Sequence, residues 1–249
     1  MLNTPASWII PEWPAPHRVK ALITTREGGF SQGCYAGFNL GDHVGDEAWA
    51  VRQNRELLCK HIPAEPKWLK QVHGTKVANA DALPAPVEAD ASVARKANTL
   101  CAILSADCLP LLLCDAKGSV VAAAHCGWRG LAAGVIEKTI SAMQTAPGAL
   151  LTYLGPAIGP KAYEVGADVH EAFLRSDTAA QLAFAALAPG KWLADLYLLA
   201  RQRLNRVGVK IIHGGNFCTY TEADRFFSHR RDGNTGRMAS LIWLETKRK

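Results

Sequence analysis

The 249-residue sequence lacks paired cysteines, long apolar runs and a strong excess of charge. Its seven cysteines are an odd number and form no CxxC pair, which argues against a disulfide scaffold and against a closed Cys₄ zinc site. No stretch approaches the length of a membrane span, and the first residues have neither the basic start nor the apolar run of a secretory signal. These absences predict a soluble, cytoplasmic protein whose thiols are reduced.

Three widespread site motifs are also missing. GxGxxG, GxxxxGK[ST] and HExxH do not occur, which excludes the usual dinucleotide, P-loop and zincin sites. The formal charge is +6, from 28 basic and 22 acidic residues, but the basic residues are scattered among acids and do not alternate with aromatics. This pattern favours a small anionic ligand over nucleic acid or a membrane as the partner.

With 49% apolar residues and no repeat or linker, residues 1–249 are expected to form one domain. Apolar runs predict strands at 19–25, 67–74, 99–106, 110–115, 119–125, 149–156, 209–213 and 238–245. Helical spacing predicts helices at 46–62, 130–145, 166–186 and 195–207, with Asp46 and Asp195 as N-caps. The Ala-, Pro- and Asp-rich stretch 79–98 is predicted to be a surface excursion. The alternation indicates a single α/β domain with a mixed sheet covered by helices.

The stretch 106–130 organises the candidate site. His73 in QVHG, Cys108 in ADCLP and His125 in AHCGW each follow an apolar run and adjoin a turn, so their tips can meet at one sheet edge. Two imidazoles and a thiolate suit zinc, with a fourth position left for water or substrate. The same residues also suit a nucleophilic site, in which Cys108 is the thiolate, a histidine is the base and Asp107 orients it. Residue types alone leave both interpretations open.

Other cysteines fit a structural interpretation better. Cys101 and Cys114 lie within apolar runs, and Cys126 follows His125 on a strand and therefore points to the opposite face. We predict that these three thiols do not belong to the site.

Long ordered motifs give the sequence a resemblance to a known family. They are GGFSQGCYAGFNLGDHVGD, NR at 54–55, QVHG, ADCLP, AHCGWRG, GPAIGPKAYEVG, CT at 218–219 and SHRRDGNTGR. From about residue 23 to 243 the chain resembles the YfiH-type family, also called the multicopper polyphenol oxidase or laccase-domain family. Members of that family include purine nucleoside phosphorylases.

The resemblance implies a layered α/β sandwich related to cysteine-hydrolase-like toxins. It also implies that His73, Cys108 and His125 bind a metal, zinc or alternatively copper. The implied activities are phosphorolysis of adenosine, inosine and 5′-methylthioadenosine to the free base and sugar 1-phosphate, together with adenosine deamination. One departure from the family pattern is visible, since His229 stands in SHRR where the family usually has tyrosine. A change there bears on substrate preference.

Phosphorolysis needs one site that binds phosphate and another that binds the nucleoside. Arginine is suited to phosphate because its guanidinium donates two parallel hydrogen bonds. The phosphate candidates are Arg26, Arg55, Arg129, Arg230 and Arg231. Asn39 and Tyr163 are candidates for binding ribose or base.

Three alternatives stay open from the sequence. One is a Cys–His hydrolase or amidase acting on peptidoglycan precursors, and another is a non-enzymatic binding module. The third is a copper-dependent polyphenol oxidase, although a true multicopper site needs more histidines than the three-ligand set supplies. The expected partners are a purine nucleoside and phosphate, and the chain can be a monomer or a homodimer.

Overall fold

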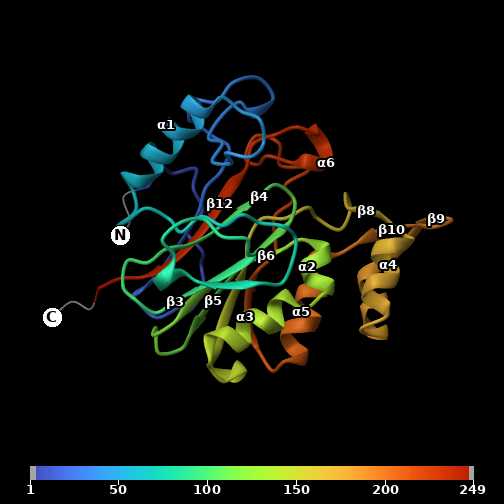
Figure 1. Ribbon diagram of the computed structural model, residues 1–249. Helices are drawn as coiled ribbons and strands as arrows, with labels where there is room; N and C mark the ends of the chain where they lie inside the picture. The colour runs from blue at the N-terminus through green and yellow to red at the C-terminus, as the bar shows by residue number, and fades with distance from the viewer. Residues whose placement is uncertain (1–3, 247–249) are drawn as a thin grey trace.

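The computed structural model describes residues 4–246, in which two β-sheets pack face to face and helices cover the outer faces (Figure 1). The strands are β1 (Val19–Ile23), β2 (Val77–Asn79), β3 (Ala91–Ala94), β4 (Cys101–Ser105), β5 (Leu109–Asp115), β6 (Val121–Cys126), β7 (Leu150–Leu154), β8 (Glu164–Gly166), β9 (Phe184–Ala188), β10 (Lys191–Ala194), β11 (Ile211–Gly214) and β12 (Met238–Leu244). The α-helices are α1 (Ala48–Cys59), α2 (Trp128–Ala132), α3 (Val135–Met143), α4 (Ala167–Leu174), α5 (Leu196–Arg206) and α6 (His229–Asp232).

The larger sheet has six strands in the order β11-β7-β5-β6-β3-β2. It is mixed, because β11–β7 and β2–β3 pair in parallel while the inner pairs are antiparallel. Every residue of β5 and β6 is buried, as expected for near-continuous apolar strands covered on both faces.

Alternating side chains of β5 build two separate cores. Leu111 and Leu113 pack in the core that includes Val135 and Ile136 of α3, whereas Leu112 packs in the core between the two sheets. The second sheet, β1-β12-β4, contributes the other half of that inter-sheet core. The prediction of a single-domain, layered α/β fold with a mixed sheet is confirmed.

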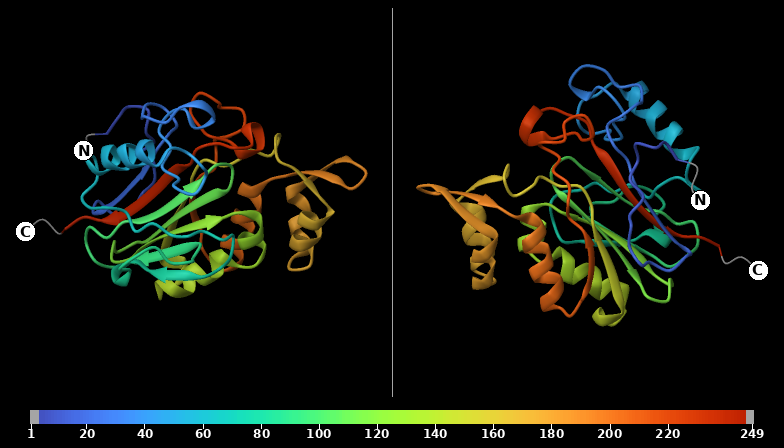
Figure 2. Two further views of the ribbon diagram at one scale, coloured as in Figure 1. Left: turned by 45° about the horizontal axis from the view of Figure 1, so that its top comes forward. Right: turned by 180° about the vertical axis from the view of Figure 1, so that it is seen from behind.

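A third core lies on the outer face of the three-stranded sheet. Leu22 and Trp243 of that sheet pack there with Leu58 of α1 and with the loop residue Phe38. The three cores therefore separate four layers: α1 with its loops, the three-stranded sheet, the six-stranded sheet, and α3 with α5 (Figures 1 and 2).

The corner 106–108 takes the chain from one sheet to the other. β4 pairs with β12 in the three-stranded sheet, whereas β5 lies in the six-stranded sheet. Asp107 turns the corner with a φ of 83°, a left-handed conformation that aspartate tolerates better than most residues. The strand predicted at 238–245 is β12, the central strand of its sheet.

Several predicted elements differ from the structure. The run 67–74 forms only isolated bridges, at Lys67 and Lys70, and not a strand. The helix predicted at 130–145 is divided into α2 and α3 by Gly134, whose φ is 94°. The helix predicted at 166–186 ends at Leu174, after which a 3-10 turn leads into β9.

The stretch 79–98 is the largest correction, because it contains the fully buried strand β3 in the six-stranded sheet. Of the two predicted N-caps, Asp195 accepts a hydrogen bond from the backbone N–H of Leu198, as expected. Asp46 does not cap α1, whose N-cap is Glu47, and it binds Ser31 and Asn39 instead.

The small sheet β8-β10-β9 and α4 form an arm at the side of the main body (Figure 2). Within residues 4–246, no helix has the length and apolar character needed to cross a membrane.

Burial predicts the cost of removing one tryptophan. Trp243 is 1% exposed at the centre of the outer core, so Trp243→Ala leaves a cavity and lowers the free energy of unfolding by about 3–5 kcal/mol. Trp49→Ala is the matched control, because Trp49 is 57% exposed, and its effect stays within about 1 kcal/mol. Urea unfolding of both variants measures the difference. Equal losses contradict this account of the core.

Candidate metal and substrate site

The register of β5 and β6 places Cys108 beside His125. In this antiparallel pair Leu109 is opposite Cys126 and Pro110 is opposite His125, so the start of one strand meets the end of the other. His73 reaches the same point from a turn with a φ of 60°. Its metal-ligating atom and those of Cys108 and His125 all lie within 4.8 Å of one another.

These three residues fit a metal ion. In a tetrahedral zinc site with bonds of 2.0–2.3 Å, neighbouring donor atoms are roughly 3.3–3.6 Å apart. Cys108 Sγ lies 3.8 Å from His73 Nε2, and all three ligand atoms lie within 4.8 Å of one another, so they approach this spacing without reaching it. Within residues 4–246, these are the only three His, Cys, Asp or Glu side chains grouped closely enough to hold a metal. Three protein ligands leave a fourth position open, as catalytic zinc sites require.

Asp90 fixes both histidines. Its side chain is fully buried, and Oδ1 lies 2.9 Å from His125 Nδ1 and accepts a hydrogen bond from the His73 backbone N–H. The other oxygen accepts from the N–H groups of Val72 and Gly74, and the Asp90 carbonyl accepts from the His125 N–H. A carboxylate that accepts a hydrogen bond from one ring nitrogen of a histidine sets its tautomer. The other ring nitrogen is then free to bind a metal.

Cys108 and His125 favour the charged forms of one another. Burial alone disfavours the thiolate, but the charge of His125 and hydrogen bonds to both histidines outweigh it and lower the pKa of Cys108. Burial likewise disfavours the imidazolium, but Cys108 and Asp90 raise the pKa of His125. The thiolate that a metal ligand or a nucleophile requires is therefore stabilised at this position.

Two glycines of the AHCGWRG segment are required by close contacts. A Cβ on Gly127 would lie 2.8 Å from His73 Cδ2 and 3.1 Å from Cys108 Sγ, inside the ligand cluster. A Cβ on Gly130 would lie 2.6 Å from the carbonyl oxygen of Gly74. Helix α2 can approach the His73 turn only because both positions lack a side chain.

The ligand cluster opens into a cavity of about 440 Å³. Its basic wall consists of Arg129, Arg230 and Arg237. The Arg129 guanidinium stacks 4.4 Å from the ring centre of Trp128, and its side chain makes no hydrogen bond to another described residue. Arg230 donates one hydrogen bond to the Glu164 carbonyl and lies over the ring of Tyr163. Arg237 donates to the carbonyls of Thr235 and Gly236, so the free donors of this wall are mainly those of Arg129.

The structure brings several predicted residues to this cavity. Asp107, Tyr163, Arg129 and Arg230 line it, as does the divergent His229. The Asp107 carboxylate does not contact a histidine, and it accepts hydrogen bonds from the Thr219 hydroxyl and from the Arg230 backbone N–H, both at 2.6 Å. The carboxylate that orients an imidazole is that of Asp90.

Four predicted substrate residues lie outside the cavity. Asn39 is fully buried and ties together Gly41, Asp46 and Arg237. Arg55 stacks on Trp68 and binds the Leu40 carbonyl.

The other two bind backbone carbonyls as well. Arg26 binds those of Ala36 and Ala223, and Arg231 binds those of Thr219, Tyr220 and Phe226. Their guanidinium groups hold loops in place.

Three residues of the site were not predicted: Asp90, Arg237 and His43. Asp90 lies in the stretch expected to be a surface excursion, and its role depends on contacts that sequence spacing does not reveal. His43 and Arg237 line the cavity, and both belong to motifs already singled out, GDHVGD and SHRRDGNTGR. Burial and the nearby Arg237 lower the pKa of His43.

The fold and the site define a class: a layered α/β protein in which two histidines and one cysteine are grouped closely enough to hold a metal ion. The family model described as multi-copper polyphenol oxidoreductase laccase matches residues 20–245. The chain belongs to this family.

Named relatives agree with this assignment. Purine nucleoside phosphorylase PA4543 of Pseudomonas aeruginosa is 50% identical, over 96% of this chain and 99% of the relative. Purine nucleoside phosphorylase YfiH of Escherichia coli is 52% identical, over 95% and 98%. The crystal structure of Neisseria meningitidis protein NMB0706 superposes with a TM-score of 0.94 at 53% identity, and covers 96% of this chain and 100% of that one.

The contacts at Gly127 predict that an added methyl group disturbs the ligand cluster. Gly127→Ala keeps an allowed backbone conformation, with φ −61° and ψ 152°, but its Cβ displaces His73 or Cys108. We expect zinc affinity to fall about tenfold or more, as for other disturbances around metal ligands. Zinc competition with a chromogenic chelator measures it. Gly148→Ala, which meets no atom within 4 Å, is the control, and an unchanged affinity in Gly127→Ala contradicts the geometry.

Asp90→Asn tests the buried carboxylate. The amide has the size of the carboxylate but not its charge, so we expect zinc affinity to fall about 10- to 100-fold. Asp115→Asn is the matched control, since Asp115 is also buried and bonded but only to Ser119 and Val120. That variant should lose stability and keep its zinc affinity. Equal zinc affinities in the two variants show that Asp90 has no special role.

Proposed function

We propose that this protein is a purine nucleoside phosphorylase that cleaves inosine, adenosine and 5′-methylthioadenosine with phosphate. One observation supports this most: a single cavity joins an open His₂Cys site to a wall of three arginines. The relatives named as purine nucleoside phosphorylases support the same reaction class. The cavity volume of about 440 Å³ lies in the range of small-molecule sites. A cytoplasmic location is part of this proposal.

The arginine wall holds the phosphate. Guanidinium groups bind phosphate oxygens with paired hydrogen bonds, and Arg129 has its donors uncommitted. Phosphate attacks C1′ of the ribose while the bond to the purine nitrogen breaks, so the product is the sugar 1-phosphate and the free base. Bringing both reactants together in one cavity supplies much of the rate.

Asp107 acts as a positioning residue in this proposal. Its carboxylate accepts a hydrogen bond from the backbone N–H of Arg230, and its backbone leads directly into Cys108. A single residue thus links the arginine wall to the ligand cluster. Tyr163 lies beneath the Arg230 guanidinium, 5.2 Å from ring centre to Cζ, and supports its orientation.

Zinc is the proposed metal, since catalytic zinc sites have three protein ligands drawn from histidine, cysteine and carboxylate and keep one position open. When bound, zinc supplies a Lewis acid and lowers the pKa of coordinated water. A copper-dependent phenol oxidase of the multicopper type needs more ligands than the single three-residue group found within residues 4–246.

Adenosine deamination is the proposed side activity, because nucleobase deaminases use an open zinc position next to the purine. Those enzymes also use a glutamate as general acid and base, and none of the residues found to line this cavity is a glutamate. We therefore expect deamination to be slower than phosphorolysis by a factor of about 10²–10⁴, the usual contribution of general acid–base catalysis. Inosine formed from adenosine without phosphate measures it.

The central assay gives purified protein inosine with and without phosphate. Hypoxanthine and ribose 1-phosphate are expected only when phosphate is present. Cys108→Ala should lose both zinc and activity, whereas Cys59→Ala, at the end of α1, should keep both. Hypoxanthine release without phosphate indicates a hydrolase. An active, zinc-free enzyme that an electrophile inactivates at Cys108 supports the Cys–His hydrolase alternative.

Arg129→Ala tests the phosphate wall. Loss of a charge-assisted hydrogen bond costs about 1.5–3 kcal/mol, so the KM for phosphate should rise about 10- to 100-fold. The KM for inosine should change much less. Arg52→Ala, an exposed arginine on α1, is the control and should leave both values unchanged. A rise confined to the KM for inosine would place the nucleoside, rather than phosphate, against Arg129.

A further inference from the structure

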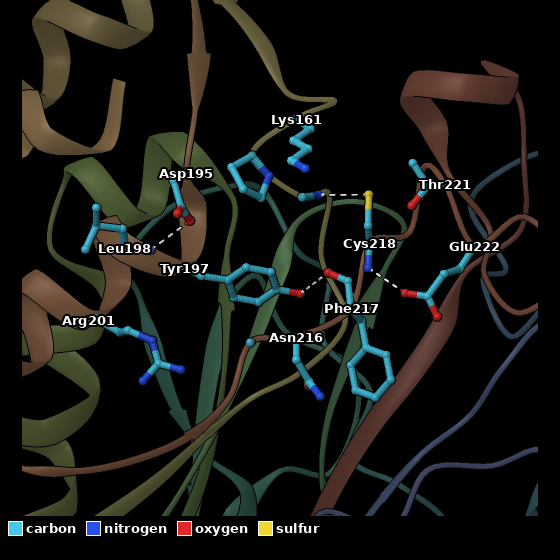
Figure 3. Close-up of a pocket in the computed structure, with 13 residues that line it drawn as sticks. Lys161, Asp195, Tyr197, Leu198, Arg201, Asn216, Phe217, Cys218, Thr221 and Glu222 are labelled. Carbon is cyan, nitrogen blue, oxygen red and sulfur yellow. Dashed lines mark hydrogen bonds between the residues drawn. The ribbon is translucent and has the colours of Figure 1, made fainter. Parts of the chain in front are cut away.

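A second cavity adjoins the catalytic one, with a volume of about 610 Å³ (Figure 3). The loop after β7, the start of α5 and the segment 215–222 form it. The two cavities have no lining residue in common, although Ile158 lines the first and Gly159 the second.

A bonded wall separates the two cavities. The Gly159 N–H donates to Cys218 Sγ at 3.2 Å, and the Thr219 N–H donates to the Ala157 carbonyl at 3.0 Å. On the catalytic side, the Thr219 hydroxyl donates to Asp107 at 2.6 Å. The second cavity is therefore a separate compartment and not an extension of the catalytic cavity.

The uncommitted polar groups of the second cavity favour an anion. The Lys161 amine and the Asn216 amide make no hydrogen bond or ion pair to another described residue, whereas the carboxylates are in use. Asp195 caps α5, and Glu222 accepts from the Cys218 N–H and pairs with Arg225. The charge left without a partner is positive.

Cys218 lies at one end of this cavity. Burial disfavours its thiolate, yet the Thr221 hydroxyl and the N–H groups of Thr221, Gly159 and Tyr220 lower the pKa of the thiol. Because these donors are committed to the sulfur, Lys161 and Asn216 are the groups left to bind an anion.

The rest of the surface is apolar and aromatic. The ring of Tyr197 lies between Lys161 and Arg201 in Figure 3, with Leu198 and Phe217 on either side of it. Arg201 is held by the carbonyl groups of Ile212 and Gly214, and so presents a fixed guanidinium. A concave, mainly apolar surface with a few fixed polar groups is typical of a small-molecule site.

We propose that this second cavity binds a small organic anion, with a flat apolar or aromatic body against Phe217 and Leu198 and a phosphate, sulfonate or carboxylate at Lys161. The site is independent of the metal and of the proposed phosphorolysis. None of its lining residues belongs to the ligand cluster or to the arginine wall.

Binding of 1-anilinonaphthalene-8-sulfonate tests the site, because this dye combines an aromatic body with a sulfonate and fluoresces in apolar surroundings. One saturable site is expected. Lys161→Ala should raise its Kd about fivefold or more, through loss of a charged hydrogen bond. Lys117→Ala, an exposed lysine elsewhere, and Arg129→Ala, in the catalytic cavity, should leave the Kd unchanged. Asn216→Trp, which fills the cavity from an exposed position, should abolish binding.

Two further readouts make the assignment specific. Phenyl phosphate and benzoate should displace the dye, and neutral benzyl alcohol should not. Bound ligand should also slow alkylation of Cys218 by iodoacetamide, measured on its peptide by mass spectrometry. The proposal is overturned if Lys161→Ala leaves the Kd of the dye unchanged, if the neutral alcohol displaces the dye, or if bound ligand does not slow alkylation of Cys218. Because none of these readouts uses catalysis, failure of the second site is distinct from failure of the phosphorylase proposal.

Discussion

The buried carboxylate of Asp90 is the interaction on which the site depends. It binds the backbone of the His73 turn through three N–H groups and contacts the imidazole of His125. A turn and a strand end that are 52 residues apart in the sequence are thereby held against one negative charge. A buried carboxylate is costly unless its oxygens are fully bonded, and the bonding partners of Asp90 are the groups that must be positioned. The hydrogen bonds that make the buried Asp90 tolerable are therefore the same ones that position the two histidines.

The fold supplies the third ligand by a change of sheet. The chain leaves β4 in one sheet, turns at Asp107 and enters β5 in the other, which places Cys108 at the opening between them. Hydrogen bonds from Thr219 and Arg230 then draw the distant segment 219–230 to the same corner. The arginine wall and the ligand cluster are adjacent because one aspartate anchors both. The same anchored segment forms the boundary with the second cavity.

The convergence of His73, Cys108 and His125 could be predicted from the sequence because each adjoins a turn after an apolar run. The buried strands next to these residues could also be predicted, because their sequences are nearly continuous apolar runs. Strand β3 could not be recognised, because its short ASVA run is surrounded by alanine, proline and aspartate, and so Asp90 was missed as well. Apolar patterning also does not reveal that β4 and β5 lie in different sheets. The sequence did not show which arginines line the cavity. Of the candidates, Arg26, Arg55 and Arg231 bind backbone carbonyls outside it, whereas Arg237, which was not predicted, is one of its lining residues.

The proposed phosphate chemistry depends on a metal held by His73, Cys108 and His125 next to three arginines. The central claim is that two histidines and one cysteine bind the metal and leave one position for a light ligand. X-ray absorption spectroscopy at the zinc edge of the zinc-loaded protein tests this most directly. We predict one sulfur at about 2.3 Å and two imidazole nitrogens at about 2.0–2.1 Å, with one further oxygen or nitrogen neighbour. Two sulfurs, or a shell without sulfur, would contradict the assignment of Cys108, His73 and His125 as the ligand set.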